Sequence, residues 1–160
     1  MSGLPATEGA DGRYAGLDAW GDAAILDALL EGQKRALSAV DVAIPALALA
    51  ANAACDALKS GGRLVYLAAG SPALISLGDA LEIPQTYGIA RDRIVLVLAG
   101  GEAITRNLVG GPEDDAEQAA RDVAAAGVSS DDFVICVSAS GTTPYTLAGL
   151  RAAKAAGAKT

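Results

Sequence analysis

Two glutamates are the residues of this sequence best placed to do acid–base chemistry. Glu82 lies in the segment DALEIPQTYG, among Leu81, Ile83 and Pro84, and such apolar surroundings favour the protonated form of a carboxyl group. Glu113 lies in GGPEDD at the start of an expected helix. Two carboxylates that share one cleft can divide the roles of general acid and general base. The alternative for Glu113 is an ordinary first-turn acid that complements a helix dipole.

Two turns rich in small and hydroxyl residues form the second candidate site. They read LAAGSP at residues 67–72 and SASGTTP at residues 138–144, and each follows an apolar run. In both, a glycine permits a tight turn, a hydroxyl can occupy the N-cap and a proline opens a helix. Because helix N-termini at the carboxyl ends of parallel strands bind phosphate, we predict that these turns hold a sugar phosphate. The alternative is that Ser71 and Thr143 are only helix caps.

Composition excludes several other kinds of chemistry. The chain has no histidine, which removes Ser-His-Asp and Cys-His nucleophile pairs and zinc sites that need imidazole. Its only cysteines, Cys55 and Cys136, each lie in an apolar run, so we expect buried, inert thiols in a reducing compartment. The 12 basic and 19 acidic residues leave a net charge of −7 without a basic cluster, which argues against binding to nucleic acid or an anionic membrane.

The elements that must position these residues begin with a helical region. Residues 1–17 are rich in small residues and are expected to form an N-terminal arm. Helical spacing of apolar residues predicts two leading helices within residues 18–60, at 18–40 and 43–60, the second with Pro45 in its first turn. The second helix is apolar on almost all sides, so we expect residues 18–60 to form a homodimer interface.

Residues 61–160 show the pattern of an α/β domain. Short apolar runs at 63–69, 93–99 and 133–139 predict buried parallel strands, and helical patterns at 72–81, 102–108, 114–126 and 144–156 separate them. This alternation predicts a doubly wound parallel sheet in three αβα layers. The chain stops at residues 158–160, where the next strand would begin, so we expect the sheet to be incomplete at the C-terminus or its edge to be covered by a partner.

The segments TEGADGRYAGLD, GGRLVYLAAG, DALEIPQTYG, VLAGGEAI, GGPEDD and SASGTTPY resemble, in order and spacing, those of the N-acetylmuramic acid 6-phosphate etherases. These are proteins with a SIS (sugar isomerase) domain, and the family's chains are considerably longer. The resemblance implies cleavage of the lactyl ether to give N-acetylglucosamine 6-phosphate and D-lactate, by elimination and hydration, without metal or cofactor. It places the two catalytic glutamates on Glu82, as the acid, and Glu113, as the base. It also implies a role in amino sugar catabolism and peptidoglycan recycling.

The turns depart from the pattern of the family. The first family turn reads GTSGR where this chain has residues 70–74, GSPAL, and the second reads ASGRTPY where it has residues 139–145, ASGTTPY. Each change removes an arginine, and arginine makes strong charge-assisted contacts to phosphate. The family segment ECPPT has also changed, with Ile83 and Gln85 in place of its cysteine and one proline. The remaining phosphate donors are expected to be hydroxyls and backbone amides of Gly70, Ser71, Ser140, Gly141, Thr142 and Thr143.

Three functions therefore stay open. The first is an etherase, or a relative with a different sugar substrate, that acts as a homodimer. The second is a sensor that binds a sugar phosphate without turning it over, and the third is a fragment without independent activity. The N-terminus has no signal-peptide pattern and no long apolar stretch free of charges and helix breakers, so we expect a cytoplasmic protein.

Overall fold

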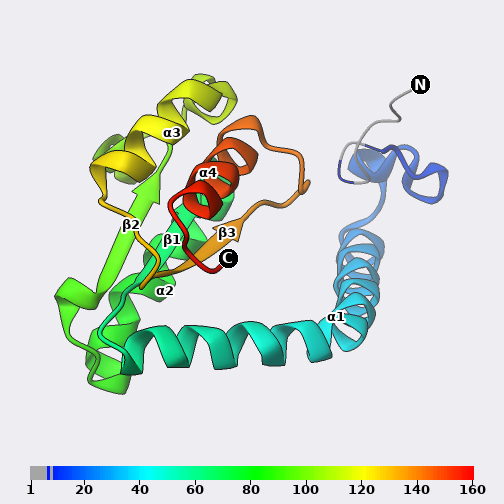
Figure 1. The fold of residues 1–160 in the computed structure, drawn as a ribbon. Coiled ribbons are helices and arrows are strands. Elements are labelled where there is room, and N and C mark those ends of the chain that lie inside the picture. Colours follow the sequence, from blue (N-terminus) through cyan, green and yellow to red (C-terminus); the bar gives the residue numbers. More distant parts are fainter. Residues whose placement is uncertain (1–6, 8) are drawn as a thin grey trace. The chain divides into compact units, whose positions relative to one another are not determined.

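A computed structural model describes Thr7 and residues 9–160 and divides the chain into two compact units. The first comprises residues 1–51 and the second residues 52–160. Helix α1 (Asp22–Lys59) continues from the first unit into the second (Figure 1).

Among its described residues, the first unit contains most of α1 and the 3-10 helices η2 (Gly12–Tyr14) and η3 (Leu17–Ala19). Arg35 on α1 donates a hydrogen bond of 2.8 Å to the Tyr14 hydroxyl, which ties η2 to the helix. The rest of the expected N-terminal arm, residues 1–6 and 8, lies outside the described residues.

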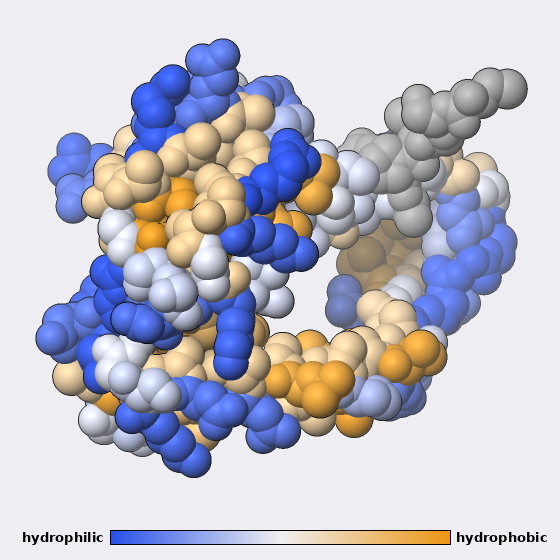
Figure 2. All heavy atoms as spheres, viewed as in Figure 1, coloured by the Kyte–Doolittle hydropathy of each residue, from blue (hydrophilic) through white to orange (hydrophobic). Residues whose placement is uncertain are grey.

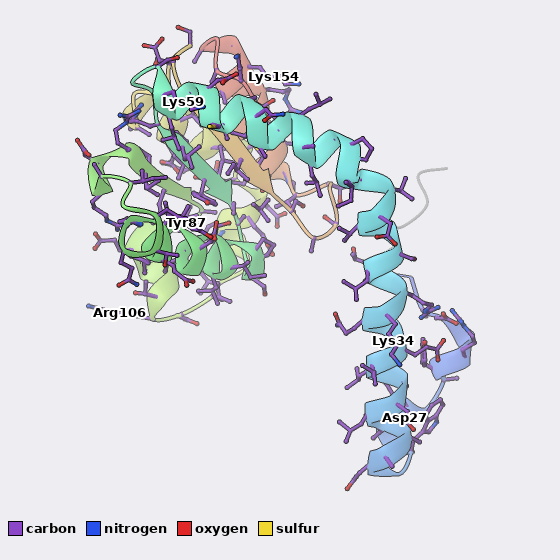
Figure 3. The ribbon with its side chains drawn as sticks, turned by 90° about the horizontal axis from the view of Figure 1, so that it is seen from below. Asp27, Lys34, Lys59, Tyr87, Arg106 and Lys154 are labelled. Atoms are coloured by element: carbon purple, nitrogen blue, oxygen red, sulfur yellow. The ribbon has the colours of Figure 1, made fainter. Side chains whose placement is uncertain are left out.

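Helix α1 replaces the two leading helices that the sequence predicted. Pro45 lies inside it, and no break separates the residues on either side. Proline removes one backbone hydrogen bond, but the alanines and leucines around it favour helix strongly enough to continue. In the described part of the chain, α1 is the one helix that is long and apolar enough to cross a membrane. Large apolar residues of α1 such as Leu37 and Leu49 are exposed, and Figure 3 shows side chains projecting from several sides of this helix.

A parallel sheet forms the centre of the second unit. It contains β1 (Leu64–Ala68), β2 (Ile94–Leu98) and β3 (Phe133–Val137) in the order β2-β1-β3. Leu64 lies opposite both Ile94 and Phe133, so the three strands begin and end in register. Lys159 forms a parallel bridge with Phe133, which places the last described residues along the outer edge of β3.

Helices cover both faces of the sheet, as the predicted three-layer architecture requires (Figure 1). Helices α3 (Ala116–Ala125) and α4 (Pro144–Ala155) pack on the face that carries Val65, Leu67, Val97 and Val134. Helix α2 (Ser71–Tyr87) and the loop after β2 pack on the other face, against Ala68 and Leu98. The side chains thus alternate between two apolar layers, because successive residues of a strand point to opposite faces.

Several local expectations are corrected. The predicted helix at 72–81 extends to Tyr87 and includes Pro84, so Glu82 lies within α2. The helix expected at 102–108 is the 3-10 helix η5 (Gly101–Thr105), and the helix expected from residue 114 starts at Ala116, after the 3-10 helix η6 (Gly111–Asp114). Another 3-10 helix, η4 (Arg91–Arg93), precedes β2. Cys55 is exposed on α1 rather than buried, because the apolar surface of that helix faces solvent.

A buried ion pair fixes the end of the sheet where the strands begin. The Arg63 guanidinium lies 2.7 Å from the Asp132 carboxylate, and Asp132 is 2% exposed. Burial alone would raise the pKa of Asp132, but hydrogen bonds from Arg63 and from the Ser129 amide outweigh it and lower the pKa. Since Arg63 also donates to the carbonyls of Ala126 and Gly127, it joins β1 to the loop before β3.

Candidate functional site

The loops that follow the three strands lie at one edge of the sheet. Ala68, at the end of β1, pairs with Leu98 of β2 and with Val137 of β3. Neighbouring parallel strands lie about 4.8 Å apart, so the loops that follow them are also neighbours. The two predicted turns, at residues 70–71 and 138–143, therefore lie side by side.

The first turn places a glycine at the start of α2. Gly70 is the N-cap, with φ +62° and ψ −145°, and its carbonyl accepts a hydrogen bond of 3.0 Å from the Ala73 amide. Ser71 is the first residue of the helix and is exposed. The alternative that Ser71 is a helix cap is therefore wrong.

Glu113 packs against this first turn. It lies in η6 and is half-buried, and its Oε2 atom is 2.7 Å from the position that a Cβ atom on Gly70 would occupy. Gly70 and Glu113 line one small pocket together with Asn107 and the apolar residues Ile104, Leu108 and Val109. The structure thus brings Glu113 to the first turn. It also adds Asn107, a polar residue outside the segments that the sequence analysis singled out.

Hydroxyl groups of the second turn bond to one another and to the backbone. Ser138 Oγ lies 2.9 Å from Thr143 Oγ1 and accepts a 3.0 Å hydrogen bond from the Gly141 amide. Ser140 Oγ accepts hydrogen bonds of 3.1 Å from the Thr142 amide and 3.0 Å from the Thr142 hydroxyl. The amides of Gly141 and Thr142 are therefore already used within the turn. Sequence reasoning missed Ser138, whose only signal was a hydroxyl directly after a strand.

Thr143 occupies the N-cap of α4 but does not cap it. Its side chain accepts no hydrogen bond from the first turn of the helix, and its hydroxyl pairs with Ser138 instead. The capping alternative for Thr143 is therefore wrong as well. In the same first turn, the Thr146 hydroxyl is buried and has no hydrogen-bond partner within the described residues.

Two contacts fix α4 behind this turn. The Tyr145 hydroxyl donates a 2.7 Å hydrogen bond to Asp122 on α3, and burial together with this bond raises the pKa of Tyr145. Further along, Gly149 lies against Leu67 of β1, where a Cβ atom would come within 2.3 Å of Leu67 Cδ1. The amino end of α4 is thus held on a rigid support.

Glu82 lies away from Glu113 within one chain. It is exposed on α2, eleven residues after Ser71. At 1.5 Å per residue, that separation is about 16 Å along the helix axis. The structure therefore places Glu113 beside the first turn and does not place Glu82 there. The expectations that Glu82 is surrounded by apolar residues and that the two carboxylates share one cleft are both wrong within one chain, because α2 continues past residue 81 with Glu82 on its exposed side.

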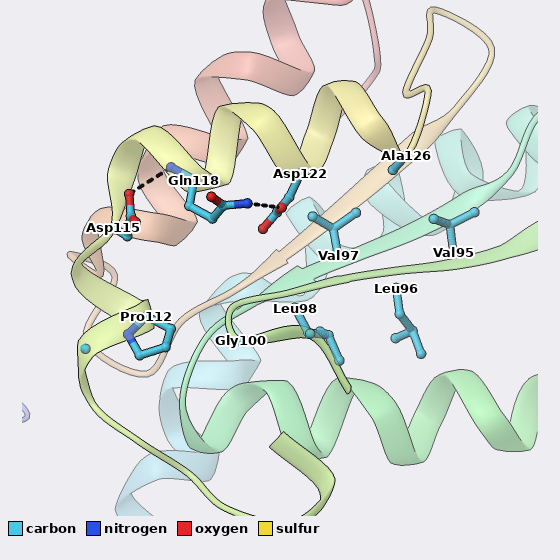
Figure 4. A pocket seen from close by; sticks show the side chains of 12 residues that line it. Val95, Leu96, Val97, Leu98, Gly100, Pro112, Asp115, Gln118, Asp122 and Ala126 are labelled. Carbon is cyan, nitrogen blue, oxygen red and sulfur yellow. Dashed lines mark hydrogen bonds between the residues drawn. The ribbon is translucent and has the colours of Figure 1, made fainter. Parts of the chain in front are cut away.

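An open hollow of about 790 Å³ lies between β2 and α3 (Figure 4). The backbone amide of Gln118 donates a 2.8 Å hydrogen bond to the side chain of Asp115, the N-cap of α3. The side-chain amide of Gln118 donates a 2.6 Å hydrogen bond to Asp122. None of these residues was predicted as a site residue, and each has a structural partner. Within Thr7 and residues 9–160, no group of three or more acidic or cysteine side chains is arranged to hold a metal ion.

Comparisons with known proteins agree with the resemblance seen in the sequence. No family model matches the chain. Over 147 residues it is 44% identical to the N-acetylmuramic acid 6-phosphate etherase of Deinococcus radiodurans. The aligned region covers 92% of this chain and 48% of that protein. The N-acetylmuramic acid 6-phosphate etherases of Mycolicibacterium smegmatis and Caldanaerobacter subterraneus are 40% and 36% identical to this chain, each over 154 residues. Both aligned regions cover 96% of this chain, and they cover 52% and 50% of the two relatives, respectively.

The chain spans about half the length of the curated relatives that it matches. Its three-stranded parallel sheet, flanked by helices and preceded by a long helix, is consistent with part of the SIS fold. Identity above one third over nine-tenths of the chain shows common ancestry: this chain is homologous to the N-acetylmuramic acid 6-phosphate etherases.

Proposed function

We propose that the chain contributes the acid–base and phosphate-binding residues of an N-acetylmuramic acid 6-phosphate etherase. The reaction would release D-lactate and N-acetylglucosamine 6-phosphate by elimination and hydration. In it, Glu113 is the base that removes the proton beside the open-chain aldehyde. Glu82 is the acid that assists the departure of lactate, and water then adds to the alkene.

One observation carries this proposal: the Glu113 carboxylate packs against Gly70 of the first turn. The second turn lies beside the first because β1 and β3 pair in register. A phosphoryl group held by Ser71, Ser140, Thr142 and Thr143 would therefore lie beside the base. Holding a substrate next to a catalytic group lowers the barrier, because the cost of bringing the groups together is met on binding.

A homodimer supplies what one chain lacks in this proposal. Glu82 lies on an exposed face of α2 with Leu74, Ile75 and Leu81, which are 41%, 71% and 51% exposed. Helix α1 exposes a longer set of large apolar residues: Leu26, Leu29, Leu30, Leu37, Val40, Val42, Ile44, Leu47 and Leu49. Part of this apolar surface is visible in Figure 2. A second copy that covered these faces would bury apolar surface and bring its own Glu82 toward the site. We place this dimer in the cytoplasm.

The second candidate function is a sensor of sugar phosphates that has lost turnover. The observation that favours it is the absence of arginine and lysine from both turns, residues 70–74 and 139–145. A sensor would still bind N-acetylglucosamine 6-phosphate, but it would release no lactate.

The deciding experiment measures D-lactate release from N-acetylmuramic acid 6-phosphate by the full chain and by the Glu113→Gln and Glu82→Gln variants. An etherase releases lactate, and each variant loses release while its affinity for the sugar phosphate stays within a few fold. Equal release by a variant would refute the role of that glutamate. No release by a folded chain that binds the sugar phosphate would favour the sensor.

A further inference from the structure

The amino end of α4 has an arrangement that ordinary capping would not produce. Threonine at an N-cap normally accepts a hydrogen bond from an N–H group of the first turn. Here Thr143 occupies the N-cap, with φ −55° and ψ 120°, yet its side chain makes no capping hydrogen bond. Its Oγ1 atom lies 2.9 Å from Ser138 Oγ instead.

Ser138 is itself held in place for this contact. Its Oγ atom accepts the 3.0 Å hydrogen bond from the Gly141 amide, and Ser140 Oγ lies 3.5 Å away. A serine hydroxyl offers one hydrogen and two acceptor sites. Since Gly141 uses one acceptor site, Ser138 still has the capacity to bond Thr143 in either direction.

We propose that Ser138 is a positioning residue that keeps the amino end of α4 open to a phosphoryl group. It does so by holding the Thr143 hydroxyl away from the first-turn N–H groups. The inference rests on the proposed function, because it takes the second turn to be the phosphate-binding turn. It goes further by assigning a role to a residue that does not itself have to contact the ligand.

The chemistry of the turn shows which donors remain for the phosphoryl oxygens. The amides of Gly141 and Thr142 are bonded to Ser138 and Ser140. Whichever hydroxyl of the Ser138–Thr143 pair donates, the hydrogen of the other stays available. Ser140 already accepts two hydrogen bonds from Thr142, so its own hydrogen can go either to Ser138 Oγ, 3.5 Å away, or to an anion. These hydroxyls and the uncapped N–H groups of α4 can bind an anion without arginine.

Removal of the Ser138 hydroxyl would release Thr143 to cap the helix. The cap and the phosphoryl group would then compete for the same N–H groups. The Ser138→Ala substitution should therefore weaken phosphate binding without lowering the stability of the free protein. A merely structural serine would behave differently, since its loss would lower stability.

The test measures thermal unfolding of the full chain with increasing inorganic phosphate and, separately, N-acetylglucosamine 6-phosphate. We expect Ser138→Ala to weaken the affinity for both ligands about tenfold, which corresponds to the free energy of about one hydrogen bond to a charged group. The Tm of the variant without ligand should be unchanged or higher. Ser138→Thr, which keeps the hydroxyl, should restore affinity. Ser60→Ala, an exposed serine before β1, is the matched control and should behave as the parent.

Each other outcome has a separate meaning. Unchanged affinity in Ser138→Ala would overturn the role of Ser138 and leave the proposed function standing. Weaker affinity with a lower Tm in both Ser138→Ala and Ser138→Thr would show a structural role and overturn the inference. If the parent chain bound neither ligand, the proposed phosphate site would fall and this inference with it. As a second readout, phosphate should shift the amide NMR signals of Tyr145 and Thr146 in the parent and less in Ser138→Ala.

Discussion

The carboxylate of Glu113 lies in the space that a side chain on Gly70 would fill. An ideal Cβ atom there would be 2.7 Å from Glu113 Oε2, closer than van der Waals contact allows. Gly70 also has φ +62°, in the left-handed region that glycine alone adopts readily. The backbone at this position therefore needs glycine, and an alanine there would push the carboxylate of the candidate base aside.

The Gly70→Ala substitution tests this contact when it is combined with Glu113→Ala. Gly70 has φ +62° and ψ −145°, a conformation that glycine alone adopts readily, so Gly70→Ala should cost about 1–3 kcal/mol of unfolding free energy. The contact with Glu113 should add little, because the carboxylate is the end of a flexible side chain and can move aside. In a double-mutant cycle measured by chemical denaturation, we therefore expect a coupling energy below about 0.5 kcal/mol. A larger coupling energy would show that Glu113 is held rigidly against Gly70.

A second glycine fixes the distance between α4 and the sheet. A Cβ atom on Gly149 would lie 2.3 Å from Cδ1 of the fully buried Leu67, so we expect Gly149→Ala to cost about 1–3 kcal/mol. Gly78 is the matched helical control, since nothing lies within 4 Å of its ideal Cβ. Gly78→Ala should stabilise the protein by about 0.5–1 kcal/mol, because alanine favours helix. If Gly149→Ala stabilised the protein as much as Gly78→Ala, this result would argue against the close packing of α4 on β1.

The buried pair of Arg63 and Asp132 predicts a pH-dependent stability. The pKa of Asp132 is lowered on folding, so its charged form stabilises the protein above the unfolded value of about 3.9. This contribution is lost as the pH falls through the lower folded pKa. We expect Asp132→Asn to cost about 3 kcal/mol at pH 7, and the difference from the parent to shrink below about pH 4. Asp131→Asn, at the exposed neighbouring position, is the control and should have little effect on the unfolding free energy. A difference in unfolding free energy between Asp132→Asn and the parent that stayed constant from pH 7 to below pH 4 would contradict the prediction.

The two cysteines should differ in reactivity toward alkylating reagents. Cys55 is exposed, whereas burial raises the pKa of Cys136 to about 11. Because the thiolate is the reactive form, a maleimide at pH 7 should label one thiol quickly and the second only on unfolding. In the Cys55→Ser variant, the fast phase should disappear. Fast labelling that persisted in this variant would show that Cys136 is accessible.

The exposed apolar side chains of α1 predict self-association. Leu37 and Leu49 are 66% and 73% exposed, and neither packs into the core of its own unit. We expect the parent chain to sediment as a dimer and Leu37→Asp or Leu49→Asp to shift it toward monomer. Lys34→Asp, a change of charge at a surface position of the same helix, is the control. A monomeric parent chain, or dimers unaffected by both leucine substitutions, would refute α1 as the interface.

The sequence by itself determined the order along the chain of the three strands and of the α-helices from β1 to α4. Short apolar runs bounded by turn residues, such as LVYLA, indicated buried parallel strands, and a glycine followed shortly by a proline marked the starts of α2 and α4. It also pointed to homology with the N-acetylmuramic acid 6-phosphate etherases, which the identity of 44% to one of them supports. These features depend on neighbouring residues, which a sequence shows directly.

Only the tertiary structure decided which of these residues meet. Gly70 and Glu113 are 43 positions apart, and their contact depends on how η6 returns over the end of β1. The same holds for Thr143, which capping statistics assign to its own helix but which bonds Ser138 across the turn. Pro45 favoured a helix start by local rules, and the continuity of α1 overrode it. In each case a contact or a continuous helix outweighs a local preference, worth about 1 kcal/mol for a helix cap and about 3 kcal/mol for a proline inside a helix, and this balance is not visible residue by residue.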